Sequence, residues 1–255
     1  MSLHSLTAEL ARARREARVL DPQAWRGVVT SVEDGYDAQA LLAGQPGHDV
    51  RGWKVTALGK EQQKLYGADK PVAGALLAPF FHNGPATLSA SDYLVPLLEC
   101  EVSFLLGQDL PPRDKPYGRE DIENAIAAVV PAMEIADCRW PDEASGVMKL
   151  ADSMGNGAFV IGQPVTDWRK LDLTNLAVTL SRDGAIVERG SSARILGNPL
   201  LAVIALANAQ PLPAGGLRRG QIVTTGTCTT PIPPAPGRYV GDYGPLGTLA
   251  WEMTA

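Results

Sequence analysis

Two glutamates stand two residues apart inside an apolar run. Residues 98–106 read LECEVSFLL, which encloses Glu99 and Glu101 among leucine, cysteine and valine. If the run is a strand, Glu99, Glu101 and Ser103 share one face, with the two carboxylates roughly 7 Å apart. A solvent-facing strand would tolerate them. In apolar surroundings each costs several kcal/mol unless it is protonated, paired or bound to a cation, so a divalent cation would resolve the repulsion.

A third acid in a similar setting extends this hypothesis. Glu134 lies within VVPAMEIADCRW, residues 129–140. By spacing alone it is equally well an exposed acid or a partner of Arg139. Oxygen ligands in near-octahedral geometry, with waters that a substrate can replace, are what Mg²⁺ requires. The three acids together therefore make a metal site attractive.

The elements that position these acids differ between the two parts of the chain. Residues 1–66 are expected to be mainly helical, because Leu6, Leu10, Ala13 and Ala17 recur at helical spacing with arginines on the opposite face. We interpret that arginine face as solvated rather than as a nucleic-acid contact. Further helices are predicted at residues 37–42, 60–66 and 119–129, and from Asn198-Pro199, where asparagine caps the first turn.

Residues 67–255 read as a β-rich core, with short branched or aromatic runs punctuated by glycine and proline. Arg182-Asp183-Gly184, between two alternating runs, predicts a hairpin. No repeat, low-complexity tract or long linker divides the chain. We therefore expect one catalytic domain over residues 1–255, of the α+β class but mainly β.

The amino-acid composition limits the kinds of molecule that the protein is expected to bind. The 255 residues are 45% hydrophobic, and 23 basic against 28 acidic residues give a net charge of −5 and a pI near 5.3. This disfavours nucleic acid and anionic membranes and favours a small molecule. No apolar run approaches a membrane span, and charges interrupt the N-terminal segment, so we expect a cytoplasmic protein. Cys100, Cys138 and Cys228, odd in number and widely spaced, are interpreted as buried thiols.

Several segments, in order, resemble a known family. They are RGWKVTALGKEQQKLYGADKPVAGALL, PLLECEVSFLLGQDL, VVPAMEIADCRW, ADSMGNGAFVIG, LGNPLLAVIALANA, LRRGQIVTTGT and PGRYVGDYGPLGTL. Together they resemble the 2-keto-4-pentenoate hydratase branch of the fumarylacetoacetate hydrolase superfamily, which also contains 4-oxalocrotonate decarboxylases. The resemblance covers most of the chain and specifies the superfamily better than the reaction.

The resemblance implies a β-sandwich roll with N-terminal and peripheral helices. It also implies that Glu99, Glu101 and Glu134 bind Mg²⁺ or Mn²⁺, which would chelate a 2-oxo acid and stabilise its enolate. In GWKVT, Lys54 lies between apolar neighbours, where desolvation and a nearby cation would lower its pKa. A surface lysine extending past Trp53 is the alternative. With the resemblance, Lys54 becomes the candidate for moving a proton or binding the substrate carboxylate.

The sequence departs from the family at two places. Hydratases of this branch carry a second acid after the proline of the Gly-x-Asp-x-Pro turn, but here that position is Val72. Asp69 is retained before the proline and is a candidate substitute, or only a turn residue. The family's Asp-Asn-Ala-Ser segment becomes DSMGN, in which Ser153 and Asn156 are the polar candidates for substrate binding. Thr225, before Gly226, is a further candidate, although alternating threonines are also good strand formers.

These features favour a metal-dependent lyase of short 2-oxo acids or 2-hydroxydienoates in the catabolism of aromatic compounds. Water addition is the first hypothesis. Val72 raises the alternative of a 2-oxo acid decarboxylase, which needs no base to activate water, or of a catalytically weak partner subunit that binds 2-oxo acids. Hydrolysis is disfavoured because His4, His48 and His82 form no His-Glu pair. The resemblance and the apolar β segments also suggest a homo-oligomer.

Overall fold

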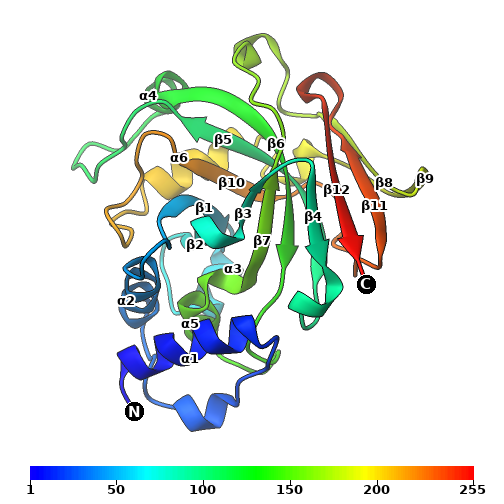
Figure 1. Cartoon of the computed structure of the whole chain (residues 1–255). Helices are drawn as coiled ribbons and strands as arrows, with labels where there is room; N and C mark the ends of the chain where they lie inside the picture. Colours follow the sequence, from blue (N-terminus) through cyan, green and yellow to red (C-terminus); the bar gives the residue numbers. More distant parts are fainter.

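The protein consists of two packed β-sheets with helices at one end and along the sides (Figure 1). This computed structural model describes all residues 1–255. The arrangement confirms the expected mainly β fold, a sandwich roll with N-terminal and peripheral helices. The helices are α1 (Leu3–Arg15), α2 (Val32–Ala43), α3 (Lys60–Leu65), α4 (Arg119–Ala125), α5 (Gly146–Ala151) and α6 (Leu200–Ala207).

The large sheet has seven strands in the order β2-β1-β10-β5-β6-β7-β3. Two of its pairings, β1 with β10 and β3 with β7, are parallel, and the others are antiparallel. Its strands are β1 (Val50–Thr56), β2 (Val72–Leu77), β3 (Phe81–Asn83), β5 (Leu97–Leu106), β6 (Ile126–Ala136), β7 (Asn156–Ile161) and β10 (Ile222–Thr227).

The small sheet has five strands and packs on the outer face of the large one. Its order is β4-β12-β11-β8-β9, built from β4 (Ala86–Ser89), β8 (Ala177–Arg182), β9 (Ala185–Ser191), β11 (Gly237–Asp242) and β12 (Thr248–Thr254). Between the sheets lies the main core, which includes Val102 and Phe104 from β5. There Tyr239 and Trp251 stack with ring centroids 4.9 Å apart. Burial of this apolar area supplies the main driving force for folding.

The large sheet curls so that its other face points inward. Lys54 on β1 contacts Glu134 on β6, three places away in the strand order, and a Cβ on Gly74 of β2 would lie 2.3 Å from the Ser153 carbonyl oxygen. Only a strongly curved sheet brings such strands together. One end of the inward face carries charged side chains. The other end, which we call the apolar end, is formed by Leu76, Val130, Ala132, Phe159 and Ile222.

Helix α2 covers the free edge of β2. Gln39 donates to the Ala73 carbonyl at 3.1 Å and accepts from the Ala75 amide at 2.8 Å, while the Tyr36 hydroxyl accepts from the Ala73 amide at 3.2 Å. The exposed polar groups of an edge strand invite pairing with other chains unless they are covered. The helix therefore closes the edge of the sheet that lies next to Lys54.

Most predicted elements are present, with two corrections. The helix expected from the spacing of Leu6, Leu10, Ala13 and Ala17 is α1, the helix predicted at 60–66 is α3, and the 182–184 turn joins β8 to β9. The helix predicted at 119–129 ends at Ala125, because the β-branched run up to Pro131 belongs to β6. The 1–66 part is not only helical, since β1 lies inside the large sheet. The short sequence of β1 is interrupted by Gly52 and Lys54, so it shows no clear alternation of polar and apolar residues.

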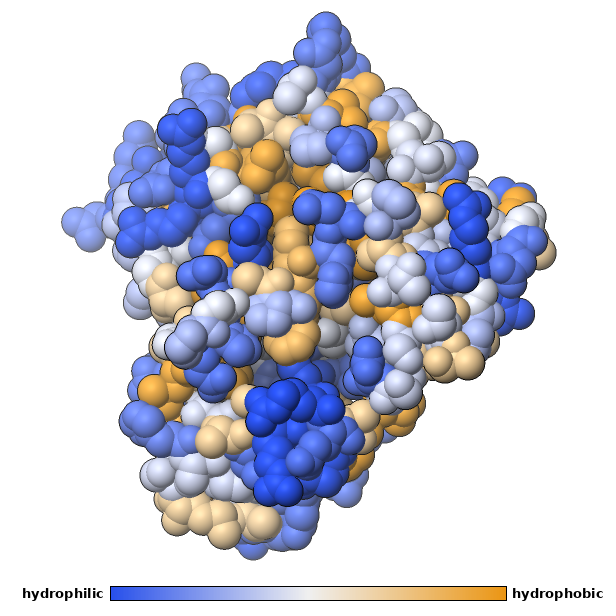
Figure 2. Space-filling view, in the orientation of Figure 1, coloured by the Kyte–Doolittle hydropathy of each residue, from blue (hydrophilic) through white to orange (hydrophobic).

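The surface agrees with the interpretation of the arginine face of the N-terminal helix as solvated. Figure 2 shows a strongly hydrophilic patch over α1, where Arg12 and Arg15 are exposed while Leu6 and Leu10 are buried. It also shows a hydrophobic band near β3 and β5, the strands that carry the partly buried Phe81 and Leu105. All three cysteines are free thiols; Cys100 and Cys228 are buried as expected, whereas Cys138 is only partly buried. None of the helices has the length and apolar character that crossing a bilayer would require.

Candidate active site and metal centre

Three glutamates meet on the inward face of the large sheet. Antiparallel pairing of β5 with β6 sets Glu99 directly opposite Glu134, and alternation along β5 puts Glu101 on the same face. Each residue offers a carboxylate oxygen, and these oxygens lie within 4.8 Å of one another. Glu101 is 2% exposed and Glu134 is fully buried. The interpretation of these acids as a solvent-facing strand is therefore wrong.

The electrostatics of this cluster fit a bound cation. Burial raises the pKa of Glu99, and the charge of Glu134 raises it further. Burial also raises the pKa of Glu101 well above its usual value, with added repulsion from Glu134 and Glu99. The Glu134 Oε2 atom is buried without any hydrogen-bond partner. Three converging carboxylates with one unused oxygen suit Mg²⁺ or Mn²⁺, which prefer such oxygen ligands.

Lys54 joins the cluster from the opposite side. Its Nζ atom lies 2.6 Å from Glu134 Oε1 and donates to the Met154 carbonyl oxygen at 3.2 Å. Burial lowers the Lys54 pKa, as expected from the sequence. The charges of Glu134 and Glu99 outweigh this effect, so that the net pKa is raised. Lys54 is thus a buried ammonium held among carboxylates, not a surface lysine.

The segment after α5 supplies one more contact and one unpartnered hydroxyl. Asn156 Nδ2 donates to Glu134 Oε1 at 3.1 Å, while the Ser153 hydroxyl is buried without a partner. Ser153, Met154 and Gly155 all have positive φ, at 50°, 57° and 67°. The left-handed conformation costs roughly 1–2 kcal/mol for each non-glycine residue. This strain is maintained where the chain presents the Met154 carbonyl to Lys54 and Asn156 to Glu134.

The threonine beside the carboxylates is Thr224 rather than Thr225. The Thr224 hydroxyl donates to Glu101 and accepts a bond from Ser103 at 2.9 Å. The Thr225 hydroxyl, which the sequence suggested for substrate binding, instead donates to the Val102 carbonyl at 2.8 Å. Consecutive residues of a strand point to opposite faces, so a shift by one residue changes the assignment. Pairing of Thr224 with Ser103 could not be deduced without the register of β10.

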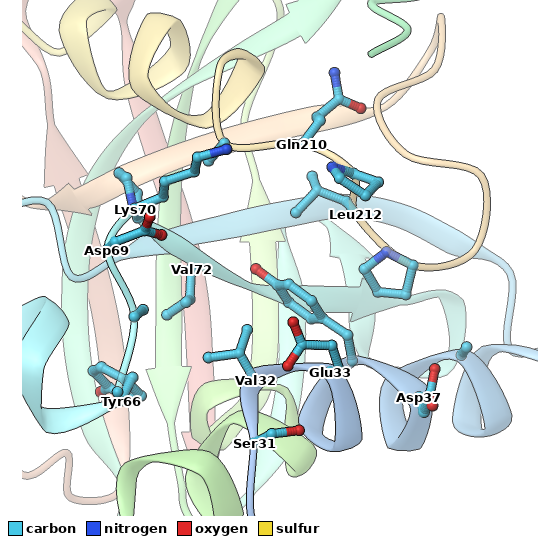
Figure 3. A pocket seen from close by; sticks show the side chains of 18 of the residues that line it. Ser31, Val32, Glu33, Asp37, Tyr66, Asp69, Lys70, Val72, Gln210 and Leu212 are labelled. Carbon is cyan, nitrogen blue, oxygen red and sulfur yellow. The ribbon is translucent and has the colours of Figure 1, made fainter.

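Asp69 lies apart from this cluster. It is exposed and lines a cavity of about 650 Å³ outside the edge of β2, between α2, residues 66–72 and the loop 209–213. Figure 3 shows Asp69 and Lys70 next to each other at the edge of this cavity. None of the three glutamates lines it, and neither does Lys54. The suggested role of Asp69 in proton transfer remains a prediction that no contact in the structure supports.

Val72 is the first residue of β2 and lines the same cavity as Asp69. It pairs with Thr56 on β1, two residues beyond the pairing of Gly74 with Lys54, and so it faces the same side as Lys54. Its side chain is buried in an apolar cluster with Leu150. No carboxylate is therefore available from this position. Arg139, the other suggested partner of Glu134, instead pairs with Asp152 at 2.7 Å.

Comparison with known proteins agrees with this arrangement. The family model for the fumarylacetoacetate (FAA) hydrolase C-terminal region matches residues 58–243. A 2-keto-4-pentenoate hydratase of Burkholderia vietnamiensis is 29% identical over 99% of this chain and 98% of its own. A 2-hydroxyhexa-2,4-dienoate hydratase of Comamonas testosteroni is 31% identical over 96% of this chain and 95% of its own.

Among solved structures, one similar fold is that of 4-oxalocrotonate decarboxylase from Pseudomonas putida G7, complexed with magnesium and adipate. It superposes with a TM-score of 0.83 over 99% of this chain and 97% of its own, at 23% sequence identity. The likeness extends over the whole length of the fold, including the strands that carry the three glutamates and the lysine.

Proposed function

The chain belongs to the fumarylacetoacetate hydrolase family, and from this premise we propose that it is a divalent-metal-dependent lyase of short 2-oxo acids and 2-hydroxydienoates. The observation that carries the proposal is the buried cluster of Glu99, Glu101 and Glu134 with Lys54 against it. A buried arrangement of this kind has no structural purpose that apolar residues would not serve better. Mg²⁺ or Mn²⁺ is the expected cofactor, held by the three glutamates.

The residues of the site have separable tasks. A bound divalent ion would act as a Lewis acid on oxygens of a 2-oxo acid. Lys54 places its Nζ atom 2.6 Å from Glu134 Oε1 and beside the carboxylates, where the ammonium group can bind the substrate's carboxylate or transfer a proton to carbon. Asn156 holds one oxygen of Glu134, which leaves the other oxygen unpaired. The unpartnered Ser153 hydroxyl is a candidate substrate contact, and Thr224 orients Glu101.

Water addition to a 2-hydroxydienoate is the reaction that we favour. Relatives named as hydratases are 29% and 31% identical over almost the full length of this chain. The substrate would enter at the mouth of the curled sheet, where Glu99 is partly exposed. Catabolism of aromatic compounds, which generates such dienoates, is the expected physiological setting.

Decarboxylation is the second candidate, and Val72 is the observation that favours it. Loss of CO₂ from a 2-oxo acid needs an electron sink and a proton donor to the resulting enolate, but no base for water. The site offers the three glutamates as metal ligands and Lys54. The Lys54 side of β2 offers no second acid, because Val72 is buried there among apolar side chains. A relative named 4-oxalocrotonate decarboxylase is 28% identical over 91% of this chain.

The test is turnover of two substrates with product identification by mass. Freshly made 2-hydroxypenta-2,4-dienoate and 4-oxalocrotonate are each followed by ultraviolet absorbance with enzyme and Mg²⁺. A product heavier by one water establishes a hydratase, and CO₂ release from oxalocrotonate establishes a decarboxylase. EDTA must abolish either activity. Metal binding without turnover of any 2-oxo acid would contradict the proposal and leave a binding subunit.

Val72→Asp separates the two reactions within one scaffold. A carboxylate at position 72, on the same face of the sheet as Lys54, would assist water addition and would contribute nothing to loss of CO₂. The variant should therefore raise the ratio of hydration to decarboxylation by roughly 10-fold or more. Val72→Asn is the matched control, because asparagine has the shape of aspartate without its charge. An equal change in both reactions would argue against a role for this position.

The remaining proposals concern partners and location. The substrate is a small molecule, and the protein is proposed to be a homo-oligomer, which agrees with exposure of Val95 (78%) and Leu65 (71%) on its surface. Three free cysteines agree with a reducing compartment such as the cytoplasm. Sedimentation at several protein concentrations tests the assembly.

A further inference from the structure

The left-handed segment Ser153–Gly155 needs an external restraint. Three consecutive residues with positive φ, two of them not glycine, are not a conformation that a free chain adopts. Through this segment the chain reaches the site, because the Met154 carbonyl accepts from Lys54 and the next residue, Asn156, donates to Glu134. Whatever holds the segment therefore also determines where two groups of the site lie.

Arg139 binds both ends of the segment. Its guanidinium donates to Asp152 Oδ1 at 2.7 Å from Nη2 and at 3.0 Å from Nε, and its backbone amide donates to Asp152 Oδ2 at 2.9 Å. On the other side, Nη2 donates to the Asn156 carbonyl at 3.2 Å. A further bond, from Nη1 to the Asp137 carbonyl, ties the guanidinium to the end of β6. Arg139 is 1% exposed, so no water competes for these donors.

Arg139 makes no contact with the catalytic groups themselves. The hydrogen bonds that Arg139 donates all go to Asp137, Asp152 and Asn156, and its carbonyl accepts from the Leu20 amide at 2.8 Å. The planar fork of a guanidinium can bridge a carboxylate and a carbonyl at fixed geometry, which an ammonium cannot do. A buried ion pair is in general weak evidence for stability, so its value here needs another explanation.

We propose that Arg139 is a positioning residue, which fixes the Lys54 ammonium and the Glu134 carboxylate by clamping Asp152 and Asn156 on either side of the left-handed segment. Nothing in the family match or in the names of the relatives assigns it this role. Its consequence for turnover rests on the proposed function. Its consequence for the geometry of Lys54 does not.

The first experiment measures Lys54 directly. In the wild type the Lys54 side chain is 12% exposed and its ammonium is bonded to Glu134 and the Met154 carbonyl, so that acetic anhydride should acetylate it slowly. In Arg139→Gln the segment loses the hold that Arg139 exerts through Asp152 and Asn156, and acetylation of Lys54, located by peptide mass, should accelerate about 10-fold or more. Asp152→Asn, which removes the other half of the clamp, should have the same effect. Arg139→Lys should not restore the wild-type rate.

The second readout is metal affinity by titration calorimetry with Mg²⁺ alone. Loss of a group that orients a ligand typically weakens metal binding about 10- to 100-fold, and both clamp variants should fall in this range. The shape of the pH profile for turnover should also change, since Lys54 and Glu134 no longer keep their separation. Arg139→Lys should behave like Arg139→Gln rather than like the wild type.

Two controls separate positioning from a general loss of structure. Arg14→Gln removes a nearby guanidinium that donates to the Gly157 carbonyl at 3.5 Å and lies 4.0 Å from the centre of the Phe80 ring, and it should leave Lys54 labelling unchanged. Leu180→Ala lowers stability from the small sheet, where Leu180 is fully buried, and should also leave Lys54 labelling and metal affinity unchanged below its melting temperature.

The outcomes distinguish this inference from the proposed function. A folded Arg139→Gln variant with wild-type Lys54 labelling and metal affinity would overturn the inference. So would an equal increase in Lys54 labelling in Leu180→Ala, since the effect would then reflect stability alone. Absence of Mg²⁺ binding and of turnover in the wild type would refute the proposed function, while the labelling experiment would still decide the role of Arg139.

Discussion

The two ends of the inward face of the large sheet share strands β6 and β7 but are filled in opposite ways. The apolar end packs Leu76, Val130, Ala132, Phe159 and Ile222. The polar end contains Lys54, Glu99, Glu101, Glu134 and Asn156. Both ends are largely shielded from water. Burial stabilises the first through the hydrophobic effect and destabilises the second by removing charges from solvent.

This difference shows how the fold tolerates its site. The polar end has three carboxylates for one ammonium, so that repulsion and burial raise the pKa of Glu99 and Glu101. The apolar end and the core between the sheets must offset that cost. Substitutions at the polar end should therefore change activity without lowering stability, whereas those at the apolar end should do the reverse.

The largest effect is expected from Glu101→Gln. Loss of one of three carboxylates removes several kcal/mol of metal-dependent stabilisation, so that turnover should fall at least about 1,000-fold. The metal-free variant should unfold at a higher temperature than the wild type at pH 8, because the repulsion with Glu99 and Glu134 is gone. Calorimetric melting with EDTA measures this. A lower melting temperature would contradict the idea that the site destabilises the fold.

Lys54→Met should lower turnover roughly 100-fold or more, the usual contribution of a positioned proton donor. Methionine fills a similar volume but carries no proton and no charge. Metal binding should persist, since Glu99, Glu101 and Glu134 remain. Rapid-mixing assays measure turnover, and Mg²⁺ titrations measure metal affinity. Equal losses of turnover and metal affinity would mean that Lys54 acts only by holding Glu134 in place.

Leu76→Ala tests the apolar end. Leu76 is fully buried, and truncation of such a residue typically costs about 2–5 kcal/mol. Urea unfolding should show this loss, while turnover per folded molecule and Mg²⁺ affinity stay within about twofold of the wild type. The two ends would not be independent if Leu76→Ala weakened metal binding as strongly as it weakened the fold.

The smallest effect is a pH dependence of the metal-free protein. The folded-state pKa of Glu101 is raised, so its contribution to stability is fully present below the unfolded pKa, about 4.3 for glutamate, and is lost as pH rises through the folded pKa. The melting temperature of the wild type should therefore fall relative to Glu101→Gln as pH rises from about 4.3 to 8. Mg²⁺ should reverse the difference, because it stabilises the wild type more than Glu101→Gln. A difference in melting temperature that does not depend on pH would mean that ionisation of Glu101 is not its cause.

Local pattern predicted the parts of the site that depend on one strand. Alternation along LECEVSFLL places Glu99, Glu101 and Ser103 on one face, and the register confirms it. The hairpin at 182–184 and the amphipathic α1 follow equally from short-range patterns. These features depend on the two-residue period of strands, the period of helices and turn chemistry, all of which a window of several residues contains.

Other assignments failed because they depend on neighbours that are distant in sequence. The expectation for Thr225 missed by one residue, since only pairing of β10 with β5 shows that Thr224 meets Ser103. The net pKa of Lys54 is raised rather than lowered, because Glu134 arrives from a strand 80 residues away. The role of Asp69 stays a prediction, because the fold leaves this residue exposed beside a cavity that none of the three glutamates lines.

The sequence by itself therefore determined which acids share a face of one strand and, through the ordered family segments, which metal-dependent chemistry to expect. Only the tertiary structure decided that the sheet curls until Lys54 meets Glu134, and that Arg139 grips Asp152 and Asn156 around a left-handed segment. The physical reason is that side-chain direction follows local backbone geometry, whereas proximity between strands depends on register, twist and loop closure over the whole chain.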